Sequence, residues 1–257
     1  MSAGYDQADT NSKNGVKSMW EDSRVSKDRR YHVIKGLPLY EARYDEVLSF
    51  HHPGLAPARQ GKVWFHIKHN GERAYNRSFD KAWGFYEELA SVVLNNLSFH
   101  ITFHGEPAYE HRFAWVGNFQ QLRCAVRFLN GRYGHIRTDG MPAYKQTYRY
   151  AGDFKEGYAV VQTDDGLHMH VDFDGIPLNG RRYMDLGPFH KGFAAALDSK
   201  GWFHIDEGGA PLYDNRFSFV EPFYNGQSRV GTKNGGIFVI NEEGRVITTL
   251  MEDKQTS

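Results

Sequence analysis

The sequence predicts an all-β fold made of tandem repeats of about 35 residues, arranged as a seven-bladed β-propeller. One glycine, taken here as the anchor of each repeat, recurs at spacings of 35, 34, 35, 35, 34 and 35 residues. Aromatic residues recur at fixed distances after it, and apolar and polar residues alternate just before it. An open β-solenoid or β-superhelix would have the same period and is the alternative. The anchor glycines are Gly36, Gly71, Gly105, Gly140, Gly175, Gly209 and Gly244.

Each repeat is expected to contain four short strands. The clearest copy runs along Ala125–Phe128, turns at Asn130 and Gly131, and returns along Tyr133–Arg137. Glycine adopts the positive φ that such hairpin turns require. A third strand should then carry a tyrosine four residues after the anchor, and a short fourth strand should end at a phenylalanine fourteen residues after it. Residues 80–96 have a helix-forming composition, but the repeat register assigns them to strands, and propensity is the weaker signal.

The phenylalanines at the fourteenth position are expected to form the core of the array. Six consecutive repeats have phenylalanine there, which indicates one shared packing role. These residues are Phe50, Phe85, Phe119, Phe154, Phe189 and Phe223.

The two ends of the chain predict how a ring would close. The last repeat stops before its fourth strand, and Lys17–Trp20 lies where a strand beside Arg245–Leu250 would complete it. Closure of this kind removes the open edge of a sheet array. We therefore interpret residues 17–250 as a single seven-unit domain, flanked by a disordered tail at residues 1–16 and a short tail at residues 251–257.

Composition excludes several classes of partner. The chain has 31 basic and 31 acidic side chains, so no net charge favours nucleic acid or an anionic membrane. No segment approaches the roughly 18 apolar residues of a membrane span, and residues 1–16 do not resemble a signal peptide. The single cysteine, Cys124, is expected to be a small core residue in a reducing, cytoplasmic protein.

A histidine occupies one position of the second strand in six consecutive repeats. Such a series could form equivalent binding sites for a repetitive ligand. The structural alternative, which we favour, is that each neutral imidazole is buried and hydrogen-bonded between neighbouring repeats. The histidines are His32, His66, His100, His135, His170 and His204.

One repeat also has metal-ligand spacing. His168, His170 and Asp172 alternate along a strand and could face one ion. The repeat register alone accounts for two of these positions, however, so no metal and no other cofactor is expected.

Tyrosine and arginine side chains of the expected third strand are further candidates for binding. A tyrosine with a nearby arginine could hold a sugar or an acidic peptide by stacking and bidentate hydrogen bonds. The alternative is that each guanidinium covers aromatic surface within its own repeat. The candidates are Tyr40, Tyr75, Tyr109, Tyr144, Tyr213, Arg43, Arg112, Arg182 and Arg216.

The repeats resemble the WG (Trp-Gly) repeat family of bacterial proteins over about residues 20–250. Trp202–Asp206 matches its Trp-Gly-Tyr-Ile-Asp element, with phenylalanine for glycine and histidine for tyrosine. Phe154–Ala159 and Phe189–Ala194 match its Phe-x-x-Gly-x-Ala element. The resemblance implies β-rich interaction modules with no fixed chemistry.

The function expected from these observations is a non-catalytic binding or scaffold module with a protein partner. A repeat lectin that binds a glycan is the first alternative. An enzyme with one site at a propeller mouth is the second, although no repeat departs enough in its polar residues to identify catalytic groups.

Overall fold

The structure is a computed structural model that describes residues 19–254, and it contains seven small antiparallel sheets. The expected tail at residues 1–16 lies outside the described residues. Within the described part of the chain, the one helical element is the 3-10 turn η1 (Met19–Asp22), and no helix has the length and apolarity that a membrane crossing requires. The all-β fold class and the sevenfold repetition are therefore confirmed.

Six sheets have three strands, and the last has four. In chain order the strands of the first four sheets are β1 (Arg24–Val25), β2 (His32–Ile34), β3 (Leu37–Pro38); β4 (Glu46–Val47), β5 (Ala56–Gln60), β6 (Val63–Ile67); β7 (Lys81–Tyr86), β8 (Leu89–Leu94), β9 (Leu97–Ile101); β10 (Trp115–Val116), β11 (Cys124–Arg127), β12 (Tyr133–Ile136). Those of the last three are β13 (Tyr150–Ala151), β14 (Ala159–Gln162), β15 (His168–Val171); β16 (Asp185–Leu186), β17 (Phe193–Asp198), β18 (Gly201–Asp206); β19 (Phe219–Val220), β20 (Gln227–Gly231), β21 (Ile237–Asn241), β22 (Val246–Met251).

The predicted hairpins and the strand assignment of residues 80–96 are confirmed, whereas the expected third strand is wrong for most repeats. After β12, for example, only isolated bridges form, at Pro142 and Tyr148. Four of the five repeats without this strand have a proline two residues after the anchor glycine, which has no N–H to extend a ladder. The proline is not the whole reason, because the second repeat has Arg73 there and forms only a bridge, whereas the two-residue strand β3 includes Pro38. In the last repeat this position is Val246, and the six-residue strand β22 forms there. The fourth strand is also shorter than expected, since β10 ends at Val116, before the recurrent phenylalanine.

The anchor glycines have a packing role as well as a turn role. Gly140 has a φ of +77°, and a Cβ built on it would lie 2.4 Å from the Tyr109 ring of the preceding repeat. Gly105, Gly175 and Gly244 meet the tyrosine of the preceding repeat in the same way. At five anchor glycines a tyrosine ring of the preceding repeat thus lies directly against the turn, and at Gly209 the side chain of Asn179 does so; only glycine leaves room for it.

The recurrent phenylalanines are the largest buried side chains of the array, as predicted. Phe119, Phe154 and Phe189 are at most 1% exposed, and Phe50, in the first repeat, is half-buried. Phe154 also stacks on Phe173, with ring centroids 4.8 Å apart. Ring contacts of this kind join neighbouring repeats, and the buried apolar side chains of residues 19–254 form four clusters along the array.

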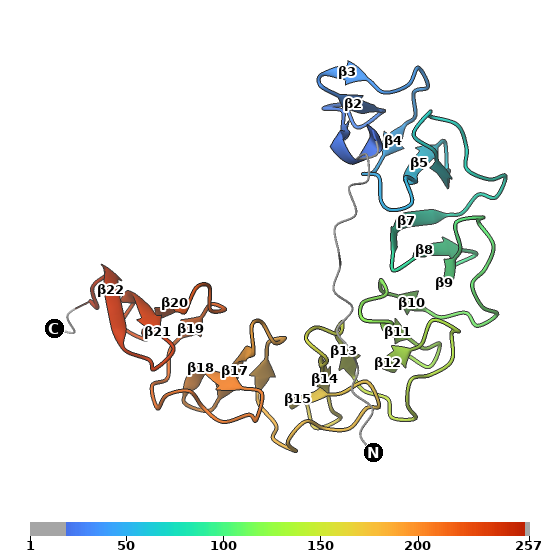
Figure 1. The fold of residues 1–257 in the computed structure, drawn as a ribbon. Helices are drawn as coiled ribbons and strands as arrows, with labels where there is room; N and C mark the ends of the chain where they lie inside the picture. Colours follow the sequence, from blue (N-terminus) through green and yellow to red (C-terminus); the bar gives the residue numbers. More distant parts are fainter. Residues whose placement is uncertain (1–18, 255–257) are drawn as a thin grey trace, which may run out of the picture.

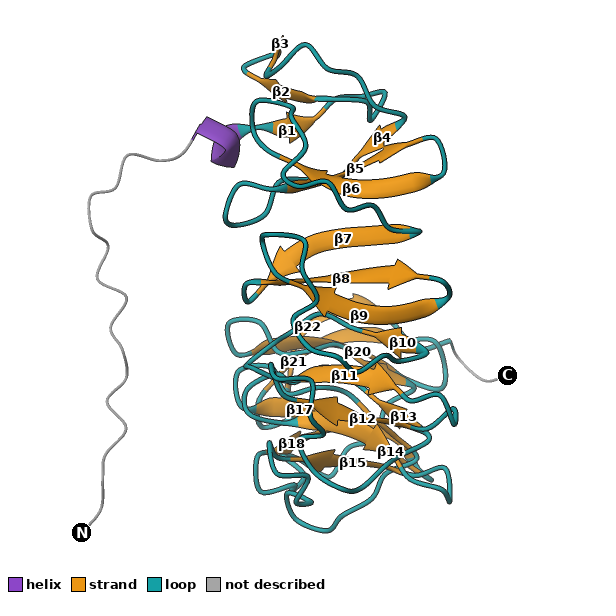
Figure 2. Cartoon of the chain, turned by 90° about the vertical axis from the view of Figure 1, so that its right-hand side faces the viewer, coloured by secondary structure: helices purple, strands orange, loops and turns teal. Residues whose placement is uncertain are grey.

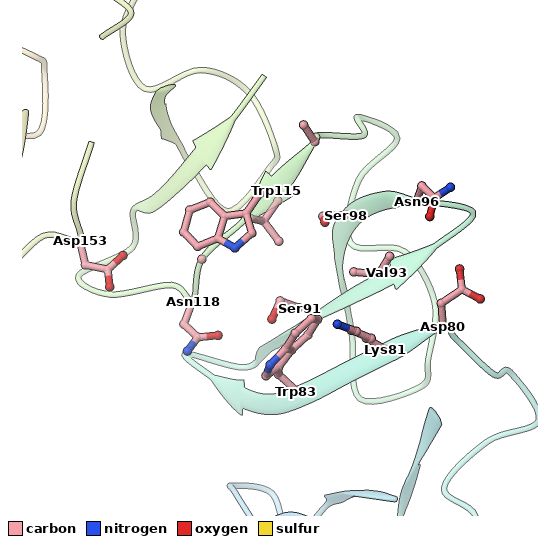
Figure 3. A pocket seen from close by; sticks show the side chains of 13 residues that line it. Asp80, Lys81, Trp83, Ser91, Val93, Asn96, Ser98, Trp115, Asn118 and Asp153 are labelled. Atoms are coloured by element: carbon pink, nitrogen blue, oxygen red, sulfur yellow. The ribbon is translucent and has the colours of Figure 1, made fainter. Parts of the chain in front are cut away.

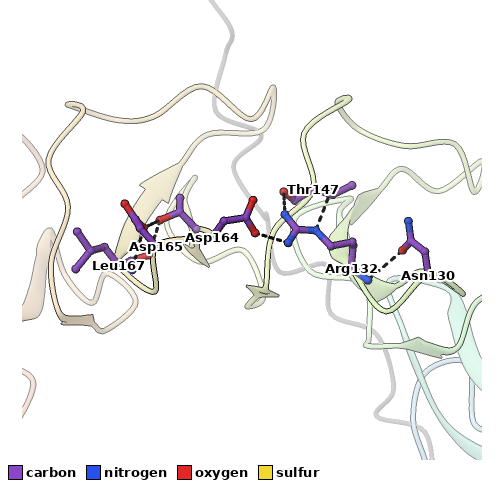
Figure 4. Close-up of polar contacts among 7 residues, drawn as sticks. Asn130, Arg132, Thr147, Asp164, Asp165 and Leu167 are labelled. Carbon is purple, nitrogen blue, oxygen red and sulfur yellow. Dashed lines mark hydrogen bonds and ion pairs between the residues drawn. The ribbon is translucent and has the colours of Figure 1, made fainter.

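Polar contacts also join successive repeats (Figure 4). Arg132 forms an ion pair with Asp164 of the following repeat, and its Nη2 donates to the Thr147 carbonyl at 2.7 Å. The Glu156 carboxylate accepts hydrogen bonds from the backbone N–H groups of Lys191 and Gly192, at 2.7 and 2.9 Å. These contacts link neighbouring sheets at the surface of the array.

The seven sheets follow an open arc rather than a closed ring. Figure 1 shows β2 and β3 at one end and β22 at the other, well separated, and Figure 2 shows the strands stacked in layers along the array. The expected closure is wrong for the described residues, because Met19–Asp22 forms the 3-10 turn and β22 pairs only with β21. Trp20 packs instead on Phe50 of the first repeat. Each repeat forms a small antiparallel sheet like a propeller blade. The sheets follow an open path, however, as in the superhelical alternative.

Candidate functional site

The six repeated histidines form an internal framework. All six are at most 5% exposed. Each Nε2 lies 2.7–3.0 Å from a backbone carbonyl oxygen in the segment that leads into the next sheet, for example that of Gly117 for His100. A carbonyl only accepts, so Nε2 carries the proton and Nδ1 of the neutral ring is an acceptor.

The repeated tyrosines supply the proton for that acceptor. The hydroxyl groups of Tyr40, Tyr109 and Tyr213 lie 2.7, 2.5 and 2.5 Å from Nδ1 of the histidine in the same repeat. Tyr75 and Tyr144 make the same bond. His170 keeps only its carbonyl contact, because Asn179 replaces the tyrosine of that repeat. The expectation that these imidazoles are buried and hydrogen-bonded is confirmed, and in five of the six both ring nitrogens have a partner.

Burial disfavours the charged form of these rings. It lowers the histidine pKa from 6.5 to about 4 in five repeats and lowers the pKa of His32 as well. It also raises the pKa of the partner tyrosines. The five histidines are His66, His100, His135, His170 and His204.

Three of the four candidate arginines contact an aromatic ring and backbone carbonyls of their own repeat. The guanidinium of Arg112 lies 3.9 Å from the Phe99 ring centroid, and its Nη1 donates to the carbonyls of residues 109, 110 and 111. Arg43 and Arg216 do the same in their repeats. Arg182 differs, since it pairs with Asp165 at 2.6 Å.

The metal-like spacing and the cysteine have structural partners too. His168 Nδ1 lies 3.1 Å from the Met184 carbonyl, and Asp172 accepts two backbone N–H groups. Residues 19–254 contain no group of three His, Cys, Asp or Glu side chains placed to hold a metal ion. Cys124 is buried, and burial raises the pKa of its thiol, as expected of a core residue.

A different set of residues lines a cavity beside β7 and β10. Trp83 of β7 and Trp115 of β10 project into one space of about 630 Å³, with Asn118 and Asp153 beside them (Figure 3). A second space of about 500 Å³ lies between Trp115, Tyr133 and Tyr150, and a third of about 450 Å³ lies beside Tyr150. Asp153 lines all three. We call this surface, defined by Trp83, Trp115, Tyr133, Tyr150 and Asp153, the aromatic groove.

Strand pairing aligns the rings of the groove. Trp115 pairs with Arg127, and Arg127 pairs with Tyr133, so the three side chains share one face of the sheet. The centroids of Trp115 and Tyr133 are 6.3 Å apart, and those of Tyr133 and Tyr150 are 5.8 Å apart. Trp83, Trp115 and Tyr150 nevertheless remain 41%, 45% and 47% exposed. Large rings left this open on a rigid sheet are available to a ligand.

The histidine framework holds the floor of the groove. His66 donates to the carbonyl of Trp83 at 2.8 Å, and His100 and His135 donate to those of Gly117 and Gly152, at 3.0 and 2.7 Å. A Cβ at Gly117 would lie 3.2 Å from Trp115 Cη2 and 3.3 Å from Asp153 Oδ1. This glycine therefore allows the indole and the carboxylate to converge.

Asp153 is the charged group at the centre of the groove. Its side chain is accessible, yet burial by the groove walls raises the pKa of its carboxyl. Its one side-chain hydrogen bond among the described residues is a long contact of 3.4 Å from Gln120 Nε2. The nearest basic groups on the lining are engaged elsewhere: Lys155 Nζ lies 3.1 Å from His190 Nδ1, and Arg127 Nε donates to the Gly131 carbonyl at 3.4 Å.

The candidate residues predicted from the sequence belong to the internal framework. The residues of the aromatic groove were not among them. A signal was present, because an aromatic residue, any residue, glycine and Asn or Asp recur at residues 115–118 and 150–153. The corresponding four residues of the other repeats differ from this pattern. The sequence therefore does not show that the two neighbouring copies form one surface.

Several solved structures are similar to this chain. The chain is similar to BamB from Moraxella catarrhalis (13% identity, 85% of this chain and 78% of that chain, TM-score 0.47) and to the computationally designed Ika8 protein (11%, 88% and 82%, TM-score 0.51). It is also similar to the WD40 β-propeller domain of Doa1 (13%, 84% and 88%, TM-score 0.36). Likenesses at this level of identity concern the fold alone. No curated protein matches the chain. The family model for the WG-containing repeat matches residues 36–64 and 133–166, so the chain is an all-β repeat protein with two segments that are similar to the WG-containing repeat.

Proposed function

We propose that this chain is a non-catalytic interaction module that binds a protein partner along the aromatic groove. The observation that carries the proposal is the exposure of Trp83, Trp115 and Tyr150 on a framework whose internal groups are hydrogen-bonded. Tryptophan and tyrosine contribute much of the energy at protein interfaces, because they bury a large rigid surface.

The groove suits an extended segment of polypeptide. Its three spaces adjoin one another through shared residues, Asp153 in all three and Tyr150 in two. Alternating side chains of an extended peptide could occupy successive spaces, since they project at regular intervals.

The chemistry of the histidines supports binding rather than catalysis. Histidine is the side chain best suited to proton transfer near neutral pH. Here the six repeated histidines are committed to internal carbonyl contacts, and burial keeps them neutral. They serve the function by fixing the backbone beneath Trp83 and Trp115.

We further propose that residues 17–250 act as one domain in the cytoplasm. Polar and aromatic contacts link successive repeats throughout the described array, and the buried thiol of Cys124 suits a reducing compartment. Limited proteolysis should yield one resistant fragment with these boundaries, and internal cleavage between repeats would contradict the single domain.

Selection from a random linear peptide library tests the proposed function. We expect the wild-type protein to enrich a peptide family, and the double variant Trp83→Ala/Trp115→Ala to lose its binding. Tyr224→Ala is the matched control, because Tyr224 is 62% exposed and lies outside the groove. Failure to enrich any peptide, or equal binding by the double variant, contradicts the proposal. A glycan array measured in parallel would show a carbohydrate ligand if the same double variant abolished its binding, which would replace the protein partner with a glycan.

A further inference from the structure

We infer that Asp153, with Trp115 and Tyr150, binds the cationic side chain of an arginine or a lysine in the partner polypeptide. This inference rests on the proposed function and adds the chemistry that the partner must present. It starts from the position of Asp153, which lines all three spaces of the aromatic groove.

The Asp153 carboxylate lacks a strong internal partner. Among the described residues it receives one hydrogen bond, from Gln120 Nε2 at 3.4 Å, and forms no ion pair. Three other acidic side chains of neighbouring repeats do form ion pairs: Asp164 pairs with Arg132, Asp165 with Arg182 and Asp198 with Arg216. Asp153 differs from these in facing a cavity rather than an arginine of its own chain.

The surroundings of Asp153 make an unpaired negative charge unfavourable. The groove walls displace water from the carboxylate, and this desolvation raises its pKa. A neutral ligand would displace still more water without supplying a counter-charge, so it would worsen the environment of the carboxylate. A cation would supply the missing charge and would donate hydrogen bonds to both carboxylate oxygens.

The aromatic walls favour the same class of ligand. A cation close to an aromatic face is attracted to it, most strongly when the ring is tryptophan. Trp115 and Tyr150 line the space of about 500 Å³ that Asp153 shares, and each is nearly half exposed. The Cη2 atom of Trp115 and the Oδ1 atom of Asp153 lie within 3.3 Å of one point above Gly117. That point is too close to the Gly117 backbone for a guanidinium, but it shows that the indole and the carboxylate are near neighbours. A guanidinium in the adjoining space of about 500 Å³, which both residues line, would contact the two together.

Basic residues of the chain itself leave this position free. Lys155 is directed to His190, and Arg127 lies 5.9 Å from the Tyr133 ring centroid and donates to the Gly131 carbonyl. Lys81 shares the space of about 630 Å³ with Asp153 and Trp115, but among the described residues it forms no ion pair with Asp153. The charge that completes the site must therefore come from the ligand.

The test uses the peptides that the wild-type protein selects. We expect them to share an arginine or a lysine at one position. Replacement of that arginine by citrulline, or of that lysine by norleucine, should weaken binding about tenfold to a hundredfold in calorimetry, the usual range for a charged hydrogen-bonded contact. Asp153→Asn should weaken the cationic peptide equally but leave the affinity of the neutral peptide unchanged. Asp174→Asn, in an exposed turn, is the control, and thermal unfolding confirms that each variant is folded.

The outcomes separate this inference from the proposed function. Peptides that need Trp83 and Trp115 but contain no shared cation overturn the inference and leave the proposed function intact. The same holds if the citrulline or norleucine peptide binds as tightly as its parent, or if Asp153→Asn binds as wild type does. Failure to select any peptide overturns both.

Discussion

Acidification should destabilise this protein steeply, because its repeated histidines are buried in the neutral form. In five repeats the folded-state pKa is about 4, against 6.5 for an accessible imidazole. A lowered folded pKa contributes stability above pH 6.5, where both states are neutral. That stability is lost as the pH falls from 6.5 toward 4, since the unfolded chain takes up protons first.

The magnitude follows from the size of the shift. At pH 5.5 the unfolded imidazoles are mostly protonated and the folded ones are not, so each histidine reduces the free energy of unfolding by about 1.4 kcal/mol. Five such groups give a loss of about 7 kcal/mol, comparable to the entire stability of many domains. The exposure of these rings, at most 5%, leaves little solvent screening to weaken the effect.

Urea denaturation at pH 7.5 and pH 5.5 measures this loss directly. We expect a large decrease in the urea midpoint at pH 5.5 and recovery on return to pH 7.5. NMR titration of the folded protein should show the repeated imidazoles still neutral at pH 5.5. Equal midpoints at the two pH values, or imidazoles that titrate near 6.5 in the folded state, would refute the reasoning.

Three substitutions test the packing of the repeats, each by chemical denaturation. Phe154→Ala should lower the free energy of unfolding by about 3–5 kcal/mol, because Phe154 is 1% exposed; an unchanged midpoint would contradict its place in the core. Gly140→Ala should cost about 1–3 kcal/mol more than Gly157→Ala, since both have positive φ but only Gly140 meets a ring of the preceding repeat; equal losses would mean that φ alone matters. Asn179→Tyr should restore the hydroxyl contact to Nδ1 of His170 and raise stability by about 1 kcal/mol, and a loss of stability would show that this repeat has closed over the smaller side chain.

The repeat itself could be predicted from the sequence, because its signals are local and recur in register. Three kinds of residue recur at one position of the repeat: the anchor glycine, the histidine of the second strand and the phenylalanine fourteen residues after the anchor. Because each kind occurs six or seven times, the copies support the same prediction. The missing third strand could also have been anticipated. Pro107, Pro142, Pro177 and Pro211 occupy the same position, and proline donates no hydrogen bond to a ladder. The signal is partial, because Pro38 at that position lies in β3 and the repeat with Arg73 there has no third strand.

The path of the array and the groove were harder to predict. Closure depends on the small rotation between neighbouring sheets, which contacts such as Arg132 with Asp164 set and which no local pattern reveals. The groove depends on two adjacent repeats that carry Trp115 and Tyr150 with Asp153 between their sheets. The regular spacing of residues indicated the histidine and tyrosine framework that recurs along the array. The candidate site lies where neighbouring repeats differ from that shared pattern.

The indole N–H resonances of the five tryptophans test the central claim, that the aromatic groove is the binding surface. Each can be assigned by a single Trp→Phe variant and followed in a two-dimensional NMR titration with an arginine peptide selected on the wild-type protein. We predict that the Trp83 and Trp115 resonances shift with one saturating curve, while those of Trp64 and Trp202, outside the groove, do not move. Saturation that moves only Trp64 or Trp202, or that moves no indole resonance, would contradict the account.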